Sequence, residues 1–148
     1  KRGAYDGELV VVGRMGWKSD DLIPRLRSRD VLHLDYLPPN ELASVYRKAE
    51  IFVFPSIYEG FGFPLLEAMA SGVPSIAARS SSLPEVGADA ALYFDPSNAR
   101  ELEGAIEQLL KDRGLCEELI ARGKRRVAEF RWDVTAEQTL TVMRKVSS

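Results

Sequence analysis

The sequence has one cysteine, one histidine and no long apolar run, and each of these scarcities excludes a class of protein. Cys116 has no partner for an internal disulfide, which favours a reducing compartment over a disulfide-bonded secreted scaffold. No stretch approaches the roughly eighteen apolar residues of a membrane-spanning helix, and no signal peptide is visible. The net charge of −2 gives no electrostatic reason to expect nucleic-acid binding. We therefore expect a soluble, cytoplasmic protein that binds no nucleic acid.

The residue types used in metal and thiol chemistry are also scarce or badly spaced. No cluster of His, Cys or Asp stands at metal-ligand spacing, so no metal is expected. Cys116 lies in a helical pattern, so a packed structural thiol is a simpler interpretation than a catalytic thiol. His33 alternates with Leu32 and Leu34 in a predicted strand, so we expect it to be packed and hydrogen-bonded.

What is present is an ordinary globular composition. The 148 residues, 45% hydrophobic and 28% charged, can bury one sizeable core and are expected to form one domain. Predicted strands alternate with predicted helices, which indicates an α/β fold with a Rossmann-like, doubly wound parallel sheet, and helices alone follow. The strands are expected over residues 9–12, 31–35, 51–54, 73–77 and 91–94. The helices are expected from Ser19 or Asp20 to residue 27, over 40–49, around Glu67, over 83–86 as a single turn, and over 99–111, 115–130 and 134–146. Ser97 and Asp133 are the expected caps of the helices at 99–111 and 134–146.

The most informative stretch is SIYEGFGFPLLE at residues 56–67. It follows the buried strand at 51–54, which Pro55 ends. Gly60 and Gly62 give the backbone freedom and allow a ligand close to the main chain, and Pro64 fits the first turn of a following helix. The amides of that turn carry about half a positive charge and suit a diphosphate. The backbone alone thus predicts an anion site.

Two glutamates flank this turn. Glu59 stands at the carboxyl end of the strand, the edge at which open α/β sheets bind ligands. Glu67 lies about one turn into the helix, past the position of a capping-box glutamate, and its carboxylate could accept hydrogen bonds from both hydroxyls of a ribose. The alternative is a pair of solvated surface glutamates.

These residues resemble a known family, the retaining glycosyltransferases of the GT-B group often called family 4, which includes bacterial mannosyl- and glucosyltransferases for cell-surface polysaccharides. The resemblance covers the chain from about residue 9 to its end. Its motifs are FPS at 54–56, EGFG at 59–62, the pair Glu59 and Glu67, EAMASGVP at 67–74, SSLPEV at 81–86 and DP at 95–96. It implies the C-terminal, donor-binding half of a GT-B enzyme. The N-terminal acceptor domain and the first β–α unit are expected to lie outside this chain.

The resemblance also implies site residues. The substrate would be a nucleoside-diphosphate sugar, with GDP or UDP as the carrier, and no bound cofactor is expected. Glu59 is the implied catalytic residue, which orients sugar hydroxyls; a covalent nucleophile is less favoured, because a front-face route assisted by the leaving phosphate is commonly proposed for the family. The implied donor-binding residues are Gly60, Phe61, Gly62, Phe63, Glu67, Tyr36 and Leu37. Arg14 and Lys18 are candidate phosphate contacts, although the short interval between residues 9 and 31 places the family's cation pair upstream of Lys1.

Three features leave alternatives open. Ser80, Ser81 and Ser82 either donate hydrogen bonds toward the donor or satisfy the turn before Leu83. The terminal helices of the family tend to lie against the partner domain, whereas core packing within this domain is the simpler account of Trp132. The last helix fits both accounts equally.

The expected function is transfer of a sugar, with mannose as the guess, to a polysaccharide or lipid-linked acceptor. The partners implied are the nucleotide sugar, the N-terminal GT-B domain and the acceptor, with peripheral association of the full-length enzyme at the inner face of the membrane left open. The isolated chain is expected to be inactive. The alternatives are a noncatalytic nucleotide-binding or regulatory domain on the same scaffold, and a sugar-phosphate epimerase or phosphorylase, which would need different motifs.

Overall fold

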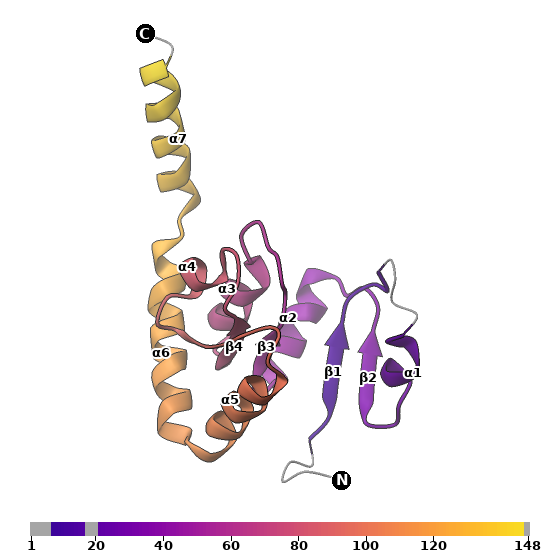
Figure 1. The fold of residues 1–148 in the computed structure, drawn as a ribbon. Coiled ribbons are helices and arrows are strands. Elements are labelled where there is room, and N and C mark those ends of the chain that lie inside the picture. The colour runs from indigo at the N-terminus through magenta and orange to yellow at the C-terminus, as the bar shows by residue number, and fades with distance from the viewer. Residues whose placement is uncertain (1–6, 17–20, 147–148) are drawn as a thin grey trace. The chain divides into compact units, whose positions relative to one another are not determined.

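The computed structural model describes residues 7–16 and 21–146 (Figure 1). In chain order its elements are β1 (Leu9–Val12), α1 (Ile23–Leu26), β2 (Val31–Leu34), α2 (Pro39–Lys48), β3 (Phe52–Phe54), α3 (Phe63–Ala70), β4 (Ser75–Ala78), α4 (Leu83–Gly87), β5 (Ala91–Phe94), α5 (Ala99–Lys111), α6 (Arg113–Glu129) and α7 (Trp132–Val146). Ser19 and Asp20, the two expected caps of the first helix, lie outside the described residues. The described strands alternate with helices and pair in parallel, and α5 to α7 follow β5 without a further strand up to residue 146. The predicted α/β class with C-terminal helices is confirmed.

The described strands form two hydrogen-bonded sets, one in each of two compact units, residues 1–42 and 43–148. In the first unit β1 and β2 run in parallel with Leu9 opposite Val31. Gly13 ends β1, and its N–H donates to the Leu34 carbonyl over 2.9 Å. The ring of His33 donates through Nε2 to the Gly13 carbonyl oxygen over 2.8 Å, so the expected hydrogen bond is confirmed, while the side chain is only half-buried.

In the second unit the strand order is β3-β4-β5, so each strand lies beside the strand that precedes it in the sequence. All four residues of the central strand β4 are buried, as expected for a strand with partners at both edges and helices against it. Its polar residue Ser75 is fully buried, and its hydroxyl donates to the Val73 carbonyl over 3.1 Å. The core around β4 includes the fully buried side chains of Leu65, Met69 and Leu83.

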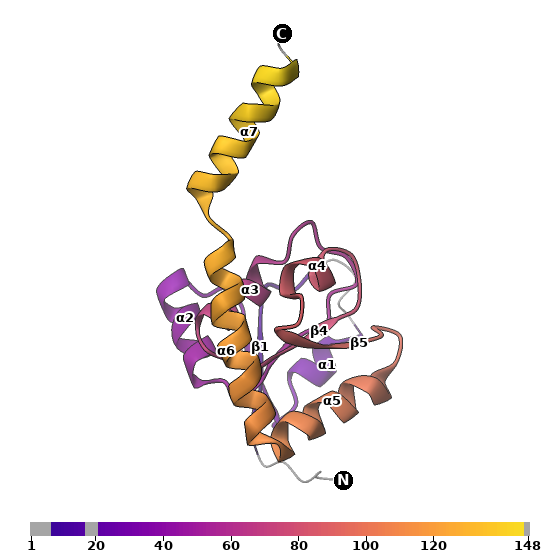
Figure 2. The same cartoon turned by 90° about the vertical axis from the view of Figure 1, so that its left-hand side faces the viewer.

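The helix that carries Glu67, α3, is enclosed by β3, β4, α4 and α6. Figure 2 shows α6 alongside α3, with α5 at the beginning of α6. Gly123 of α6 allows the close approach, because a Cβ there would lie 3.1 Å from the Cβ and Cγ atoms of Met69. This packing fixes the position of α3 and therefore of its N-terminal end, where the predicted site begins.

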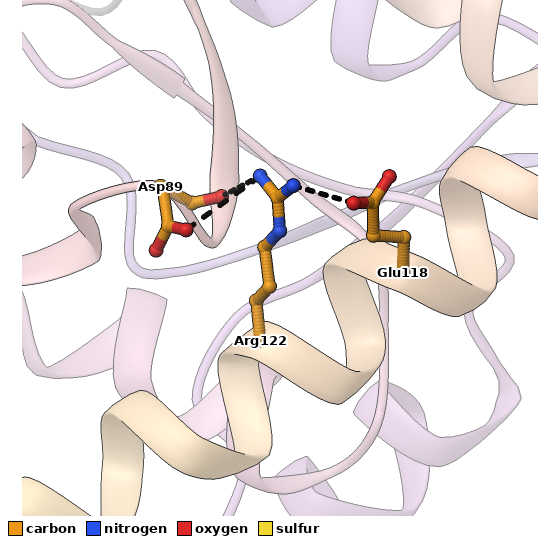
Figure 3. Close-up of polar contacts among 3 residues, drawn as sticks. All are labelled: Asp89, Glu118 and Arg122. Atoms are coloured by element: carbon orange, nitrogen blue, oxygen red, sulfur yellow. Dashed lines mark hydrogen bonds and ion pairs between the residues drawn. The ribbon is translucent and has the colours of Figure 1, made fainter.

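Two arginines of α6 hold the main chain at the end of α4. Arg122 donates to the Asp89 carbonyl oxygen over 3.1 Å and also contacts the carboxylates of Asp89 and Glu118 (Figure 3). These carboxylates are mostly exposed, so solvent screens both ion pairs. The direct bond to the main chain is the contact that ties α6 to the loop after α4.

Arg126 also donates to the main chain of α4, and to two carbonyl oxygens rather than one. Its Nε atom donates to the Val86 carbonyl over 2.9 Å and its Nη2 atom to the Glu85 carbonyl over 2.7 Å. Carbonyls at the end of a helix have no partner within the helix, so a charged donor from outside stabilises them. The guanidinium therefore caps α4 from a helix that lies 40 residues further along the chain.

The predicted caps of two helices are wrong. The side chain of Asn98, not that of Ser97, accepts hydrogen bonds from the N–H groups of Arg100 and Glu101 at the start of α5. Ser97 instead donates its hydroxyl to the carboxylate of Asp95 over 2.7 Å. Ser97 and Asn98 are both residue types that favour a helix cap, and Ser97 is instead hydrogen-bonded in the turn at Asp95.

The start of the last helix also differs from the prediction. α7 begins at Trp132, so Asp133 lies inside its first turn rather than before it. Hydrogen bonds from Arg131 and from the Val134 N–H hold the pKa of the Asp133 carboxyl below its ordinary value. Trp132 is 77% exposed, so the expectation of core packing is wrong. No described residue of α7 is buried, and none of the described helices is both long and apolar enough to cross a membrane.

Candidate functional site

The predicted glycine turn lies between β3 and α3, and Gly62 is the residue on which its geometry depends. Gly62 stands directly before α3 with a φ of +104°, a conformation that residues with a Cβ rarely adopt. A Cβ at this position would lie 2.6 Å from Cδ2 of Leu83, which is fully buried. Pro64 occupies the first turn of α3 as predicted. Gly60 has no such requirement, because a Cβ there would meet only its chain neighbours within 4 Å.

The N-terminal end of α3 faces this turn with its backbone amides. Its cap residue is a glycine without a side-chain acceptor, and its first turn contains no acidic residue. The end of such a helix carries roughly half an elementary positive charge, which suits a phosphate group. Of its first residues, Pro64 has no N–H and the Leu65 N–H donates to the Gly62 carbonyl oxygen over 3.0 Å. The feature from which an anion site was predicted is therefore present.

Glu59 lies in the turn, half-buried, and two serines from the segment before α4 hold its backbone. The Glu59 N–H donates to the Ser81 hydroxyl oxygen over 3.1 Å, and the same hydroxyl donates to the Glu59 carbonyl. The Ser82 hydroxyl lies 2.8 Å from the Phe61 carbonyl oxygen and 3.1 Å from that of Glu59, with one proton to share. The position of the Glu59 backbone is thus set by side chains 22 and 23 residues away.

The sequence left open whether the serines bond toward the donor or satisfy the turn before Leu83, and their hydroxyls in fact bond to the backbone of the turn before α3. Ser80 completes the set by donating to the Ser56 carbonyl over 2.8 Å. Ser82 stands before α4 but makes no side-chain cap bond there. Ser81 has a φ of +52°, a strained conformation that costs of order 1–3 kcal/mol and is often found at functional sites. The sequence did not predict that the serines hold the backbone of the turn before α3. The only sign in the sequence was the run of three serines, which is more hydroxyl groups than one turn requires.

Phe61 in the turn and Phe63 at the start of α3 pack against the junction of α6 and α7. The rings of Phe61 and Phe63 lie 4.7 Å apart, and Phe61 meets Phe130 edge-on at 5.6 Å. Phe63 stacks on Trp132 at 6.3 Å and remains 50% exposed. Each such pair stabilises by about 0.5–1.5 kcal/mol beyond the burial of its area. The predicted donor-binding residues are therefore tied to the start of the terminal helix.

Glu67 lies on the exposed face of α3, as its predicted role requires. Its Oε2 atom accepts a hydrogen bond from the hydroxyl of Tyr46 in α2 over 3.3 Å. Sequence reasoning did not include Tyr46, because nothing local connects residues 21 positions apart.

A cleft of about 200 Å³ borders the turn. It brings the predicted donor-binding residues Gly60 and Phe61 together with α4 and the end of α6. Its lining consists of Gly60, Phe61, Ser82, Glu85, Val86, Arg126 and Phe130. Pockets that enclose a whole small ligand usually have volumes of about 300–1,000 Å³, so this cleft can take only part of a ligand.

The remaining predicted contacts lie in the first unit. Tyr36 and Leu37 follow β2; Tyr36 is exposed and Leu37 is half-buried. The guanidinium carbon of Arg14 lies 5.3 Å from the centre of the Tyr36 ring, a cation–π distance. Lys18 lies outside the described residues. The structure thus brings Arg14 to one of the predicted donor-binding residues, Tyr36, while both glutamates belong to the second unit.

Other reactive groups do not add to the site. Among the residues that the structure describes, no three His, Cys, Asp or Glu side chains gather as they would around a metal ion. Cys116 is half-buried in α6, with its Sγ atom 3.2 Å from the Leu109 carbonyl oxygen. Burial, with a further contribution from Asp112, raises the pKa of the Cys116 thiol, so the reactive thiolate is disfavoured at neutral pH.

A family model described as glycosyl transferases group 1 matches residues 5–126. The matched span contains the glycine turn, both glutamates and the three serines. The chain belongs to glycosyl transferases group 1. Members of this hexosyltransferase family use nucleotide-sugar donors.

The curated relatives of this chain include several mannosyltransferases, and two of them match over most of its length. "O-antigen chain mannosyltransferase B" of Escherichia coli is 39% identical over 137 residues, which cover 89% of this chain and 36% of that protein. "MMP alpha-(1->4)-mannosyltransferase" of Mycolicibacterium hassiacum is 36% identical over 147 residues, which cover 95% of this chain and again 36% of the relative. The chain therefore spans little more than a third of the length of either enzyme.

A solved structure identifies which part of a glycosyltransferase this is. The C-terminal domain of LpcC, a group 1 family glycosyl transferase from Francisella tularensis, matches with a TM-score of 0.71 and 26% identity. The match covers 82% of this chain and 68% of that one. The predicted family and the match to the C-terminal half of GT-B enzymes are thus confirmed.

Proposed function

We propose that this group 1 glycosyltransferase chain is the donor-binding half of a retaining hexosyltransferase, and that residues 59–67 hold the donor. The observation that carries the proposal is the serine-held turn at Glu59, which leads through Gly62 into the amide end of α3. That arrangement holds the backbone of Glu59 in the turn that leads to the start of α3, and Glu67 follows one turn later on an exposed face. A nucleoside-diphosphate sugar offers matching groups in its diphosphate, its ribose and its hexose.

The chemistry divides between the helix end and the two glutamates. Transfer of the sugar leaves negative charge on the departing diphosphate, and the amides at the start of α3 stabilise charge that develops there. Glu59 orients the sugar hydroxyls near the reacting carbon and favours the positive charge of the transition state. Glu67 binds the ribose hydroxyls through its carboxylate. In the proposed mechanism the anomeric configuration is retained through a front-face route, with no covalent bond to Glu59.

For the substrates, we propose a GDP- or UDP-linked hexose, with mannose as the first choice, and a polysaccharide or lipid-linked acceptor. Two mannosyltransferases among the relatives, one of them named for the O-antigen chain, support this choice. Because the chain spans 36% of either relative, we propose that a second domain supplies the acceptor site. On this proposal the chain alone binds nucleotide but transfers nothing. A cytoplasmic location, with the intact enzyme at the inner face of the membrane, stays a prediction.

The test of the proposed function uses the intact enzyme with donor and acceptor. Glu59→Gln should lower turnover by about 100-fold or more, the range of a lost transition-state contact, while donor affinity changes far less. Glu103→Gln, on the exposed side of α5, is the matched control and should behave as wild type. Wild-type turnover in Glu59→Gln would end the transition-state role. Tight nucleotide binding without transfer to any acceptor would instead indicate a noncatalytic nucleotide-binding domain.

A further inference from the structure

Tyr46 places a phenol hydroxyl against the carboxylate of Glu67. Its ring is held by packing, because the residue is 8% exposed and meets Phe52 edge-on with ring centres 5.4 Å apart. Its oxygen lies 3.3 Å from Glu67 Oε2, which is longer than the usual range for a hydrogen bond between two oxygens. A buried donor from α2 therefore meets an exposed side chain on α3.

The protonation state of Tyr46 makes it a permanent donor. Burial first, and then the charge of Glu67 and the hydrogen bond to it, raise the pKa of the Tyr46 phenol well above its ordinary value of about 10. At any physiological pH the hydroxyl therefore carries its proton and can donate it to Glu67 Oε2.

We propose that Tyr46 is a positioning residue, whose hydroxyl orients the Glu67 carboxylate so that the remaining lone pairs of that carboxylate receive the two ribose hydroxyls of the donor. The inference rests on the proposed function, in which Glu67 binds the ribose. An ionised carboxylate has about four acceptor sites, and Tyr46 occupies one of them on Oε2. Enough acceptor sites remain for both hydroxyls.

The physical reason for such a residue is the freedom of a glutamate side chain. An exposed glutamate loses rotamer entropy when a ligand fixes its side chain, and this loss opposes binding. A hydroxyl that fixes the side chain before the ligand arrives removes part of this cost from the binding step. A phenylalanine would keep the packing against Phe52 but would lack the donor, so the hydroxyl is the group to test.

The chain contains a matched control. Tyr93 in β5 is half-buried, and its hydroxyl lies 3.4 Å from the Leu83 carbonyl oxygen, a main-chain acceptor outside α3. Burial raises the pKa of Tyr93 to about 12, so it is also a permanent donor. Tyr93→Phe removes the same group from the same chain without touching Glu67.

The experiment measures calorimetric affinities of the chain for GDP and UDP, and for the 2′,3′-dideoxy form of whichever binds more tightly. Tyr46→Phe should weaken binding of the ribonucleotide about three- to tenfold, because a hydrogen bond that orders a charged group is lost. It should change binding of the dideoxynucleotide less than about twofold, because the hydroxyls that Glu67 serves are missing. Tyr93→Phe should leave both affinities within about twofold. A purely structural role for Tyr46 would move both nucleotides equally.

The outcomes distinguish a failure of the inference about Tyr46 from a failure of the proposed function. Equal loss for both nucleotides, or no loss with the ribonucleotide, would overturn the inference about Tyr46. Glu67→Ala should abolish the preference for the ribonucleotide, and Tyr46→Phe added to it should cause no further loss. If Glu67→Ala leaves the ribonucleotide affinity unchanged, the ribose role in the proposed function fails. If it weakens binding while Tyr46→Phe does not, only the positioning role fails; and if the wild type binds neither nucleotide, both fail. Urea unfolding of each variant shows whether a loss reflects folding.

Discussion

Replacing Gly62 with alanine should destabilise the chain by about 2–5 kcal/mol. Two costs contribute. A residue with a Cβ is strained at the observed φ of +104°, and the new Cβ would lie 2.6 Å from Cδ2 of Leu83, which has no exposed surface into which to move. Either Leu83 leaves its rotamer or the start of α3 shifts, and both disturb the segment that holds the donor in the proposed function.

Urea unfolding followed by circular dichroism measures this cost, and Gly60→Ala is the matched control two residues away. Gly60 has open space around its Cβ position, so its replacement should change stability by no more than about 1 kcal/mol in either direction. Leu83→Ala removes the atom that the new Cβ would meet. Gly62→Ala combined with Leu83→Ala should therefore cost less than the two single changes together. If Gly62→Ala is as stable as Gly60→Ala, the reasoning from the turn geometry is wrong.

Three further predictions concern contacts around the turn. Arg126→Met should lower the stability of the chain by about 1–3 kcal/mol. The loss should exceed that of Arg122→Met, because Arg126 binds two main-chain carbonyls of α4 and is less exposed. Equal unfolding midpoints for the two variants would contradict this prediction. Ser81→Gly should be more stable than Ser81→Ala by about 1 kcal/mol, because both variants lose the hydroxyl but only glycine adopts the positive φ without strain. Thermal unfolding of the two variants at one pH measures the difference. The reverse order of stability would show that the backbone of Ser81 is not strained. Because the pKa of Tyr93 is raised to about 12, its phenol contributes its full stability to the folded state below pH 10, and this contribution falls as the pH rises toward 12. The stability of Tyr93→Phe should therefore decline less than that of the wild type over this range. Parallel curves of stability against pH would contradict the prediction.

Local rules were enough to predict the framework of the site. Short apolar runs separated by Gly and Pro gave the strands, and the described strand bounds differ from the predicted ones by at most two residues. The combination of Gly62 and Pro64 predicted a turn into a helix, because each residue type fits a specific position of that junction. The exposed place of Glu67 followed from being the one charged residue among apolar neighbours in α3.

What the sequence did not predict depends on contacts between distant residues or on choices between near-equivalent ones. The bonds from Ser81 to Glu59 and from Tyr46 to Glu67 join residues more than 20 positions apart, so no local pattern contains them. The cap of α5 fell on Asn98 rather than on its neighbour, because a turn at the preceding residues decides between two good capping residues.

A protein-detected NMR titration of this chain with GDP, UDP and ADP tests the central claim most directly. The account predicts that one of the three nucleotides shifts the amides of residues 59–67 in a saturable way, and that Glu67→Ala weakens this binding. Unchanged amides in that segment with all three nucleotides, or saturable shifts confined to other parts of the chain, would contradict it.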